Sequence, residues 1–205
     1  MGHSRRGTRW EFYSPRLEQR LVASSSLEFE HYVLVECDPE VETYSVQVAV
    51  EAEVEGESRK TILDSVVRYR DGRVVVNEVK FKDQVESSRT QFAVQRAWAS
   101  QQGYGYEVLT EDVIRVNVVH LENCHALLPW ARPLHAVPEE VRVPVMGQVA
   151  DQDKDQSIEV LVRKTGFTAG EVVSVIVRAY LAGRVLLPDI KDKKFGQGTL
   201  VRRVG

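Results

Sequence analysis

Two valine-rich segments joined at Asp71-Gly72 constrain the fold of this chain more than any other feature of its sequence. The stretch LDSVVRYRDGRVVVNEVKFK, residues 63–82, predicts two β-strands connected by a tight turn. Strands so rich in Val normally lie in the middle of a sheet, where a charged side chain is costly. These strands nevertheless carry Asp64, Glu78 and Lys80. Three charges in such a place require an explanation.

Alternation along the second strand puts Glu78 and Lys80 on one face of the sheet, with Asn77, Val79 and Phe81 on the other. If Asp64 on the neighbouring strand shares that face, two carboxylates and one ammonium group meet. Such a cluster can hold a divalent ion, position a water and stabilise phosphate charge, as in metal-dependent phosphodiester hydrolysis. Glu and Lys also alternate on many solvent-facing strands, so a plain surface remains the competing interpretation.

The length of the turn decides between these interpretations. A two-residue Asp71-Gly72 turn pairs Ser65 with Glu78 and sends Asp64 to the opposite face. A three-residue loop, residues 70–72 with a left-handed Gly72, puts Asp64 directly opposite Glu78. A shared metal site therefore predicts the three-residue loop.

Composition indicates a globular chain. Of 205 residues, 43% are hydrophobic and 28% charged, which is enough apolar material for a sizeable core. No apolar run reaches the length of a membrane span, and the Arg-bearing start lacks the apolar block of a secretion signal, so we expect a cytoplasmic protein. Cys37 and Cys124 fit no metal-ligand spacing, and no zinc site is expected.

Charge is distributed unevenly along the chain. The net charge of −3 argues against a protein that coats nucleic acid. Between Glu28 and Glu57 there is no Lys or Arg, whereas residues 1–21 and 163–203 are predominantly basic. Basic ends can hold a polyanion while an acidic middle holds metal, although a solvated surface explains the same pattern.

The order of predicted elements indicates an α/β fold. A helix at 24–36 is followed by three strands, a helix at 88–102 and a strand at 106–109. This order predicts one domain over residues 1–130. Four prolines and a polar run then predict a linker or wrapping segment over 131–156, which makes the first domain separable from the rest.

Residues 157–205 form a predicted second unit. A helix over 157–164, a turn at Gly166 and a helix over 168–182 with a Thr168–Glu171 capping box make a helix-turn-helix candidate. Two apolar runs flank KDKKFGQG, which is typical of the basic tip of a β-wing. An ordinary helical pair that packs on the first domain is the alternative.

Several of these features occur together in one family. The order of a helical Glu, a strand Asp and Glu-x-Lys resembles the PD-(D/E)xK nuclease superfamily. More closely, FYSPRLEQRLVASSSLEFEHYVLVECDPEVETYSVQ (residues 12–47), EVK (78–80) and GYGYEVLTEDVIR (103–115) resemble motifs of the TnsA family of transposon-end endonucleases. The resemblance covers roughly the first 125 residues. It implies a restriction-endonuclease-like core with a mixed central sheet and a small C-terminal winged-helix-like domain.

The resemblance also implies roles for residues. Glu28, Asp64, Glu78 and Lys80 form the implied catalytic set, with Asp64 and Glu78 as ligands of Mg²⁺, for which Mn²⁺ can substitute, and Gln47 in support. The implied reaction is cleavage of one DNA strand at each transposon end by metal-activated water. The implied partners are transposon-end DNA, a DDE-family transposase subunit and an AAA+ ATPase regulator, with no membrane. The chain departs from the family at Leu63, Ser65 and Val48, where Pro or an aromatic residue is usual.

Other functions remain open at this point. The same core occurs in stand-alone phage or restriction-type nucleases, and a non-catalytic DNA-binding or assembly module can inherit the fold. Glu28 follows Ser25 by three residues, so it can simply complete a helix cap. His31, one turn after Glu28, could approach the site. Gln91 and Gln95 could also reach it from the following helix, but they are more typical of a polar helix face and are not included in the set.

Overall fold

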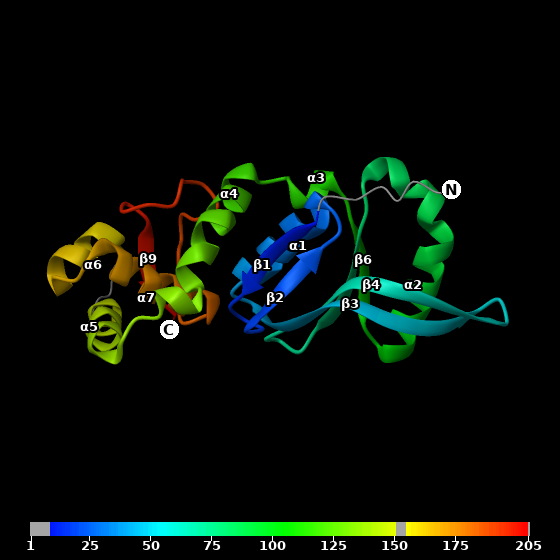
Figure 1. Cartoon of the computed structure of the whole chain (residues 1–205), viewed down its shortest axis with the longest axis horizontal. Helices are drawn as coiled ribbons and strands as arrows, with labels where there is room; N and C mark the ends of the chain where they lie inside the picture. The colour runs from blue at the N-terminus through cyan, green and yellow to red at the C-terminus, as the bar shows by residue number, and fades with distance from the viewer. Residues whose placement is uncertain (1–8, 151–154, 205) are drawn as a thin grey trace. The chain divides into compact units, whose positions relative to one another are not determined.

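The computed structural model describes residues 9–150 and 155–204, which form two compact units (Figure 1). The first unit holds Gln19–Val35, Glu40–Val116 and the residues up to Phe12. The second unit holds Tyr13–Glu18, Glu36–Pro39 and the chain from Asn117 onward. Arg5 and Arg6 of the basic start, and residues 151–154 of the predicted polar linker, lie outside the described residues. Within the described ranges, no helix combines the length and apolar character needed to cross a membrane.

A four-stranded mixed sheet forms the centre of the first unit, which confirms the predicted α/β class. Its strands lie in the order β3-β4-β5-β6, with the first two pairings antiparallel and the last parallel. The parallel pairing requires a crossover, which α2 supplies. The strands are β3 (Val41–Val54), β4 (Glu57–Tyr69), β5 (Val74–Val79) and β6 (Gly105–Leu109).

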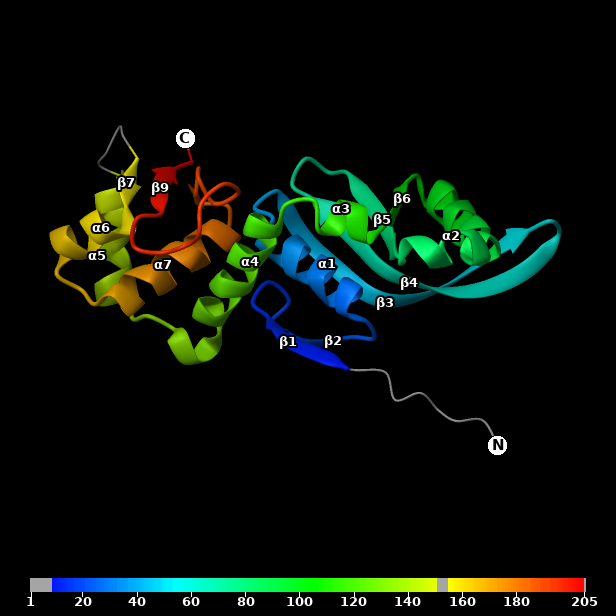
Figure 2. The same cartoon turned by 90° about the horizontal axis from the view of Figure 1, so that it is seen from above.

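Helices cover both faces of this sheet (Figure 2). On one face, Leu27 of α1 (Ser26–Cys37) packs with Val79 of β5 and with Ile114 of the short helix α3 (Glu111–Ile114). On the other face, Ala99 of α2 (Arg89–Gln102) packs against strand residues. Two 3₁₀ turns, η1 (Lys82–Gln84) and η2 (Glu86–Ser88), lead from β5 into α2. Gly103 ends α2 in the left-handed conformation, as the sequence predicts.

The loop between β4 and β5 is the predicted three-residue loop. Tyr69 N–H donates to the Arg73 carbonyl at 2.9 Å, and Gly72 N–H donates to the Tyr69 carbonyl at 3.0 Å. Gly72 has φ +89°, which glycine adopts at little cost. Strand pairing runs from Arg68 with Val74 to Ser65 with Asn77. The paired stretch ends there, and Asp64 and Glu78 are the next residues on the two strands.

A small N-terminal hairpin was not predicted from the sequence. Its strands are β1 (Trp10–Ser14) and β2 (Gln19–Ala23). In the first unit, Trp10 stacks on Phe29 of α1 with ring centroids 5.2 Å apart. In the second unit, Ser14 Oγ at the hairpin tip donates to the buried Glu36 carboxylate at 2.6 Å. The residues of the hairpin are therefore divided between the two units.

The second unit begins about forty residues earlier than the sequence predicts. We expected a linker over 131–156, but α5 (Glu139–Ala150) lies inside it and buries Val141, Val145 and Val149. Proline recurrence was misleading, because exposed Pro144 lies within the helix without ending it. Before α5 come α4 (Val118–Leu127), η3 (Leu128–Ala131) and η4 (Pro133–His135).

The rest of the second unit follows the predicted order of elements. A three-stranded sheet in the order β7-β9-β8 accompanies two helices, and Thr168 and Glu171 form the predicted capping box. Unexpectedly, nine residues of α7 are buried, because η3, α5 and α6 all pack against this helix. The elements are β7 (Gln156–Ser157), α6 (Ile158–Thr165), α7 (Ala169–Leu181), β8 (Val185–Leu186) and β9 (Leu200–Arg203).

Candidate active site

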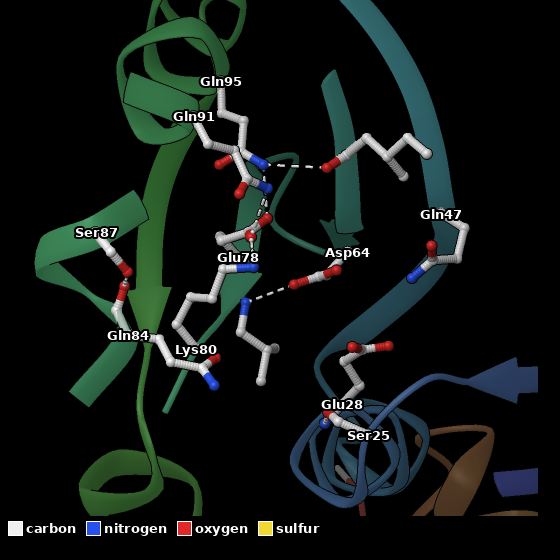
Figure 3. A network of polar contacts seen from close by, with 12 residues as sticks. Ser25, Glu28, Gln47, Asp64, Glu78, Lys80, Gln84, Ser87, Gln91 and Gln95 are labelled. Atoms are coloured by element: carbon white, nitrogen blue, oxygen red, sulfur yellow. Dashed lines mark hydrogen bonds and ion pairs between the residues drawn. The ribbon is translucent and has the colours of Figure 1, made fainter. Parts of the chain in front are cut away.

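Three polar residues lie on adjacent strands of the central sheet: Gln47 on β3, Asp64 on β4 and Glu78 on β5. The β3–β4 register pairs Val46 with Ser65 and Val48 with Leu63, which puts Gln47 opposite Asp64. Asp64 and Glu78 follow the last β4–β5 pair, Ser65 with Asn77, by one residue on each strand, and the charge of Glu78 acts on Asp64. Figure 3 shows the side chains of Gln47 and Glu28 pointing toward Asp64, with Lys80 beside Glu78. The structure thus gathers the residues that the sequence singled out.

Asp64 is fixed by the backbone around it and is 9% exposed. Its Oδ2 accepts a hydrogen bond from Val79 N–H at 2.7 Å, and the Tyr32 hydroxyl donates to its carbonyl at 3.0 Å. Burial, followed by the charge of Glu78, raises the pKa of Asp64 to about 7, although the Val79 N–H opposes this shift. The raised pKa thus reflects the burial of the carboxyl first and its proximity to a second carboxylate next.

Glu78 is held still more tightly, at 1% exposure. Its Oε1 accepts from Gln91 Nε2 and from Lys80 Nζ, each at 2.9 Å. Its Oε2 accepts from Gln95 Nε2 at 2.6 Å. Hydrogen bonds from charged or amide donors compensate the burial of this carboxylate and fix its orientation.

Gln95 is fully buried and is itself positioned by further groups. Its Nε2 also donates to the Ile62 carbonyl at 3.1 Å, and its Oε1 accepts from the Tyr106 hydroxyl at 2.8 Å. From the sequence, Gln91 and Gln95 could reach the site, but a polar helix face is the favoured interpretation and this role is not assigned to them. The available signal was their spacing of four residues on the helix that directly follows Glu-x-Lys.

Lys80 supplies the positive charge of the site. Its side chain is 23% exposed. Burial by itself lowers the pKa of Lys80, but the hydrogen bond and charge of Glu78, with Asp64 and Glu28 behind it, outweigh burial. The pKa therefore lies above its ordinary value, and Lys80 carries an ammonium group at neutral pH.

Glu28 performs the helix-capping role that the sequence left open. Its N–H donates to Ser25 Oγ at 3.1 Å, and its Oε2 accepts from Ser24 N–H at 3.0 Å. Its charge nevertheless contributes to the raised pKa of Asp64. Glu28 is thus a capping residue whose carboxylate lies within electrostatic reach of the site.

Gln47 contacts Asp64 indirectly, through the Tyr32 hydroxyl. It adopts φ 53°, a left-handed conformation that costs a non-glycine residue energy and often marks functional positions. Its Nε2 donates to the Tyr32 hydroxyl at 3.2 Å, and that hydroxyl in turn holds the Asp64 carbonyl. Gln47 therefore supports the backbone at Asp64.

His31 does not join the carboxylates. Its Nε2 lies 2.8 Å from Ser65 Oγ, to which Asn77 Nδ2 also donates at 3.4 Å. Ser65 and Asn77 neighbour Asp64 and Glu78 in sequence and so face the other side of the sheet. Burial lowers the pKa of His31 to about 4, which keeps the ring neutral.

The carboxylate pair fits a divalent ion held in part by water. Among the described residues, no three His, Cys, Asp or Glu side chains form a group that could hold a metal ion. Mg²⁺, however, needs only one or two carboxylates, since water and substrate oxygens complete its octahedral shell. Asp64 Oδ1 accepts no hydrogen bond from any described residue, and it adjoins a Glu78 carboxylate that is already oriented. Asp64 and Glu78 could therefore share such an ion.

Comparisons with known proteins do not extend these observations, since neither a protein-family model nor a curated protein matches the chain.

Proposed function

We propose that the first unit is a metal-dependent DNA endonuclease domain of the PD-(D/E)xK type. The observation that carries this proposal is the meeting of two buried carboxylates, Asp64 on β4 and Glu78 on β5, with Lys80 bonded to Glu78. The order of a helix, three antiparallel strands, a helix and a parallel strand supports it, because this core is the one the motifs imply.

Each residue has a defined task in this proposal. Asp64 and Glu78 would hold Mg²⁺ or Mn²⁺, which when bound supplies an activated water and neutralises phosphate charge. Lys80 orients the attacking water and faces the negative phosphate with its ammonium group. The Val79 N–H and the amides of Gln91 and Gln95 keep the two carboxylates in position before substrate arrives. Glu28 adds negative charge from the first helix.

We further propose that the chain serves a heteromeric transposase. In this role it cuts one strand at each transposon end, while a DDE-family subunit acts on the other strand and an AAA+ ATPase regulates target choice. Support comes from the ordered motifs of residues 12–47, 78–80 and 103–115. A subunit that depends on partners should cleave plain DNA poorly by itself. Vigorous cleavage without partners favours the stand-alone nuclease instead.

The second unit is proposed to be a winged-helix-like module that docks a partner. The order α5, β7, α6, α7, β8, β9 and the sheet order β7-β9-β8 support this assignment. Burial of α7 argues against insertion of that helix into a DNA groove, since a recognition helix needs an exposed polar face. A side chain at Gly170, for example, would lie 3.5 Å from the Trp130 ring. Docking would therefore use other surfaces of the unit.

Metal-dependent stability tests the catalytic proposal. Mn²⁺ or Mg²⁺ is expected to raise the melting temperature of the wild-type chain, because ligand that binds only the folded state stabilises it by mass action. Asp64→Asn and Glu78→Gln should abolish the shift. Asp192→Asn and Glu53→Gln remove exposed carboxylates elsewhere and serve as matched controls that keep the shift.

Two results would separate the alternatives. Equal metal-induced shifts in Asp64→Asn and Asp192→Asn would place the metal elsewhere and refute the assignment. If all the variants behave as expected, nicking of supercoiled plasmid with Mn²⁺ that is slow in the wild type and lost in Lys80→Met distinguishes a partner-dependent nuclease from a module that binds metal without cutting. Circular dichroism confirms that each variant remains folded.

A further inference from the structure

The two cysteines of the chain meet in the core of the second unit. Cys37 ends α1, and Cys124 lies in α4, 87 residues further along the chain. Cys37 Sγ donates to the Cys124 carbonyl at 3.7 Å, and the same thiol also hydrogen-bonds to the Cys124 sulfur. Both are free thiols, and both are fully buried. The nuclease proposal makes no use of them, so the two assignments stand or fall separately.

The surroundings of Cys124 favour its thiolate form. His120 precedes it by one turn of α4 and has ring nitrogens 3.9 Å (Nδ1) and 3.8 Å (Nε2) from Cys124 Sγ. The hydrogen bond from Cys37, and then His120, lower the pKa of Cys124 to about 6, although burial opposes this shift. Burial, followed by the hydrogen bond with Cys124, raises the pKa of Cys37. At neutral pH one sulfur is therefore a nucleophile, while the other keeps its proton.

The pair lies near the points where the chain leaves the second unit and returns to it. The early segment of this unit ends at Pro39, and the chain re-enters the unit at Asn117. The residues between these points belong to the first unit and include β3 to α3. A bond between the two sulfurs would therefore close the whole central sheet into one covalent loop.

We propose that Cys37 and Cys124 form an oxidation site, at which a peroxide converts the two thiols into a disulfide that a dithiol can reduce again. The Cys124 thiolate attacks one peroxide oxygen, the O–O bond breaks, and the departing hydroxide takes up a proton to become water. Cys37 then attacks the sulfur of the resulting sulfenic acid. The S–S bond forms, the S–O bond breaks, and the Cys37 proton leaves with the hydroxyl group as a second water. The two thiols lose two electrons, and the peroxide gains them.

The burial of the pair limits which oxidants can react. His120 is half-buried and contacts Cys124 Sγ, so a small displacement of this ring admits a molecule as small as hydrogen peroxide. Bulky thiol reagents are excluded from the folded chain. The proposed site is therefore selective for small peroxides.

Mass spectrometry of the reduced full chain tests the proposal with hydrogen peroxide as the probe. After treatment with stoichiometric peroxide, the chain is denatured without reductant and alkylated with iodoacetamide. The reduced wild type is expected to take up two adducts and the oxidised wild type none, and dithiothreitol should restore both. After proteolysis, a peptide that joins Cys37 to Cys124 identifies the bond.

Three variants and a matched control separate the steps. Cys37→Ser keeps a hydroxyl donor but lacks the second sulfur, so Cys124 should stop at the sulfenic acid, which dimedone traps. Cys124→Ser should take up no dimedone, because Cys37 keeps its proton. His120→Gln should be oxidised several-fold more slowly at neutral pH, since it removes a group that stabilises the thiolate. His125→Gln, at an exposed position of the same helix, should react at the rate of the wild type.

Oxidation should also raise the melting temperature by roughly 5–15 °C, because the bond restricts the unfolded chain between residues 37 and 124. Two alkylatable thiols that persist after peroxide treatment, or a bond that joins two chains instead, would overturn the proposal. So would a lower melting temperature of the oxidised chain, because it would show that the folded positions do not accommodate the bond. Equal oxidation rates of His120→Gln and His125→Gln would overturn the assignment of Cys124 as the attacking sulfur.

Discussion

At the scale of single residues, the central feature is a buried carboxylate surrounded by donors. Glu78 is almost inaccessible, yet both of its oxygens are bonded by Gln91, Gln95 and Lys80. Gln95 in turn is held by Tyr106 and by the Ile62 carbonyl. In such a network several hydrogen bonds together offset the cost of burying the carboxylate. The loss of one donor therefore weakens the other hydrogen bonds as well.

Replacement of Gln95 measures this coupling. Gln95→Met is expected to lower the free energy of unfolding by about 1–3 kcal/mol, because it removes a hydrogen bond to a buried charged group and leaves the Tyr106 hydroxyl unpaired. Gln102→Met, at an exposed position of the same helix, should change stability little. Urea denaturation gives both values. Equal stability of the two variants would mean that Glu78 is supported without Gln95.

The raised pKa of Asp64 predicts a pH dependence of stability. The pKa moves from 3.8 to about 7 on folding, so the folded protein retains a proton that the unfolded chain releases. The stability that this proton contributes is fully present below pH 3.8 and is lost as the pH rises through 7.

Asp64→Asn removes this titration while its amide oxygen can still accept from Val79 N–H. Between pH 5 and pH 8, measured in EDTA, the wild type should therefore lose on the order of 2 kcal/mol relative to this variant. Asp192→Asn should follow the wild type. A constant difference between wild type and Asp64→Asn across this range would contradict the shifted pKa.

Sequence reasoning reached some of these residues and not others for a physical reason. Asp64, Glu78 and Lys80 stood out because charge in a valine-rich strand is costly wherever it occurs. Gln95 gave no such signal, since an uncharged amide on a helix is ordinary until its burial is known. The strained backbone of Gln47 is invisible in the sequence for the same reason.

At the scale of elements, one loop sets the chemistry of the first unit. The three residues between Tyr69 and Arg73 fix the β4–β5 register, and a slip of one residue would send Asp64 to the opposite face. This loop could be predicted because a metal site permits only one loop length. The extent of α5 could not, since Pro144 is usually read as a helix breaker.

Replacement of two glycines by alanine should change the stability of the chain in opposite directions. Gly72→Ala should destabilise the chain by about 1 kcal/mol, because φ +89° strains any residue with a Cβ although no atom lies within 4 Å of it. Gly147→Ala, inside α5 and equally unobstructed, should stabilise by about 0.5–1 kcal/mol. Equal effects of the two changes in thermal unfolding would contradict the assigned loop conformation.

At the scale of the whole molecule, the chain divides between Val116 and Asn117 rather than in the proline-bearing stretch. Composition indicated a linker there, whereas the burial of Val141, Val145 and Val149 makes the stretch part of a core. Long-range packing decides this boundary, and a single sequence carries little trace of it.

Truncation after Gln156 tests this division. The sequence predicts that residues 1–156 form a stable fragment, whereas the structure predicts that they do not. Removal of α6 and α7 exposes the apolar face of α5, so we expect aggregation or loss of cooperative unfolding in the part beyond Val116. Size-exclusion chromatography and urea denaturation report on both. A monomeric fragment that unfolds in one sharp transition would restore the predicted boundary.

The two units also share the N-terminal part of the chain, and this has a consequence for synthesis on the ribosome. Tyr13–Glu18 and Glu36–Pro39 emerge long before the residues from Asn117 onward with which they form a unit. Domains usually fold in the order in which they are made. A segment that is made before the residues it packs against exposes its apolar surface in the meantime. Glu36 and Cys37, both fully buried in the finished chain, cannot be covered at the end of α1 until the residues from Asn117 onward have been made. The last residues of α1 are therefore expected to become buried later in synthesis than Glu28, which belongs to the first unit.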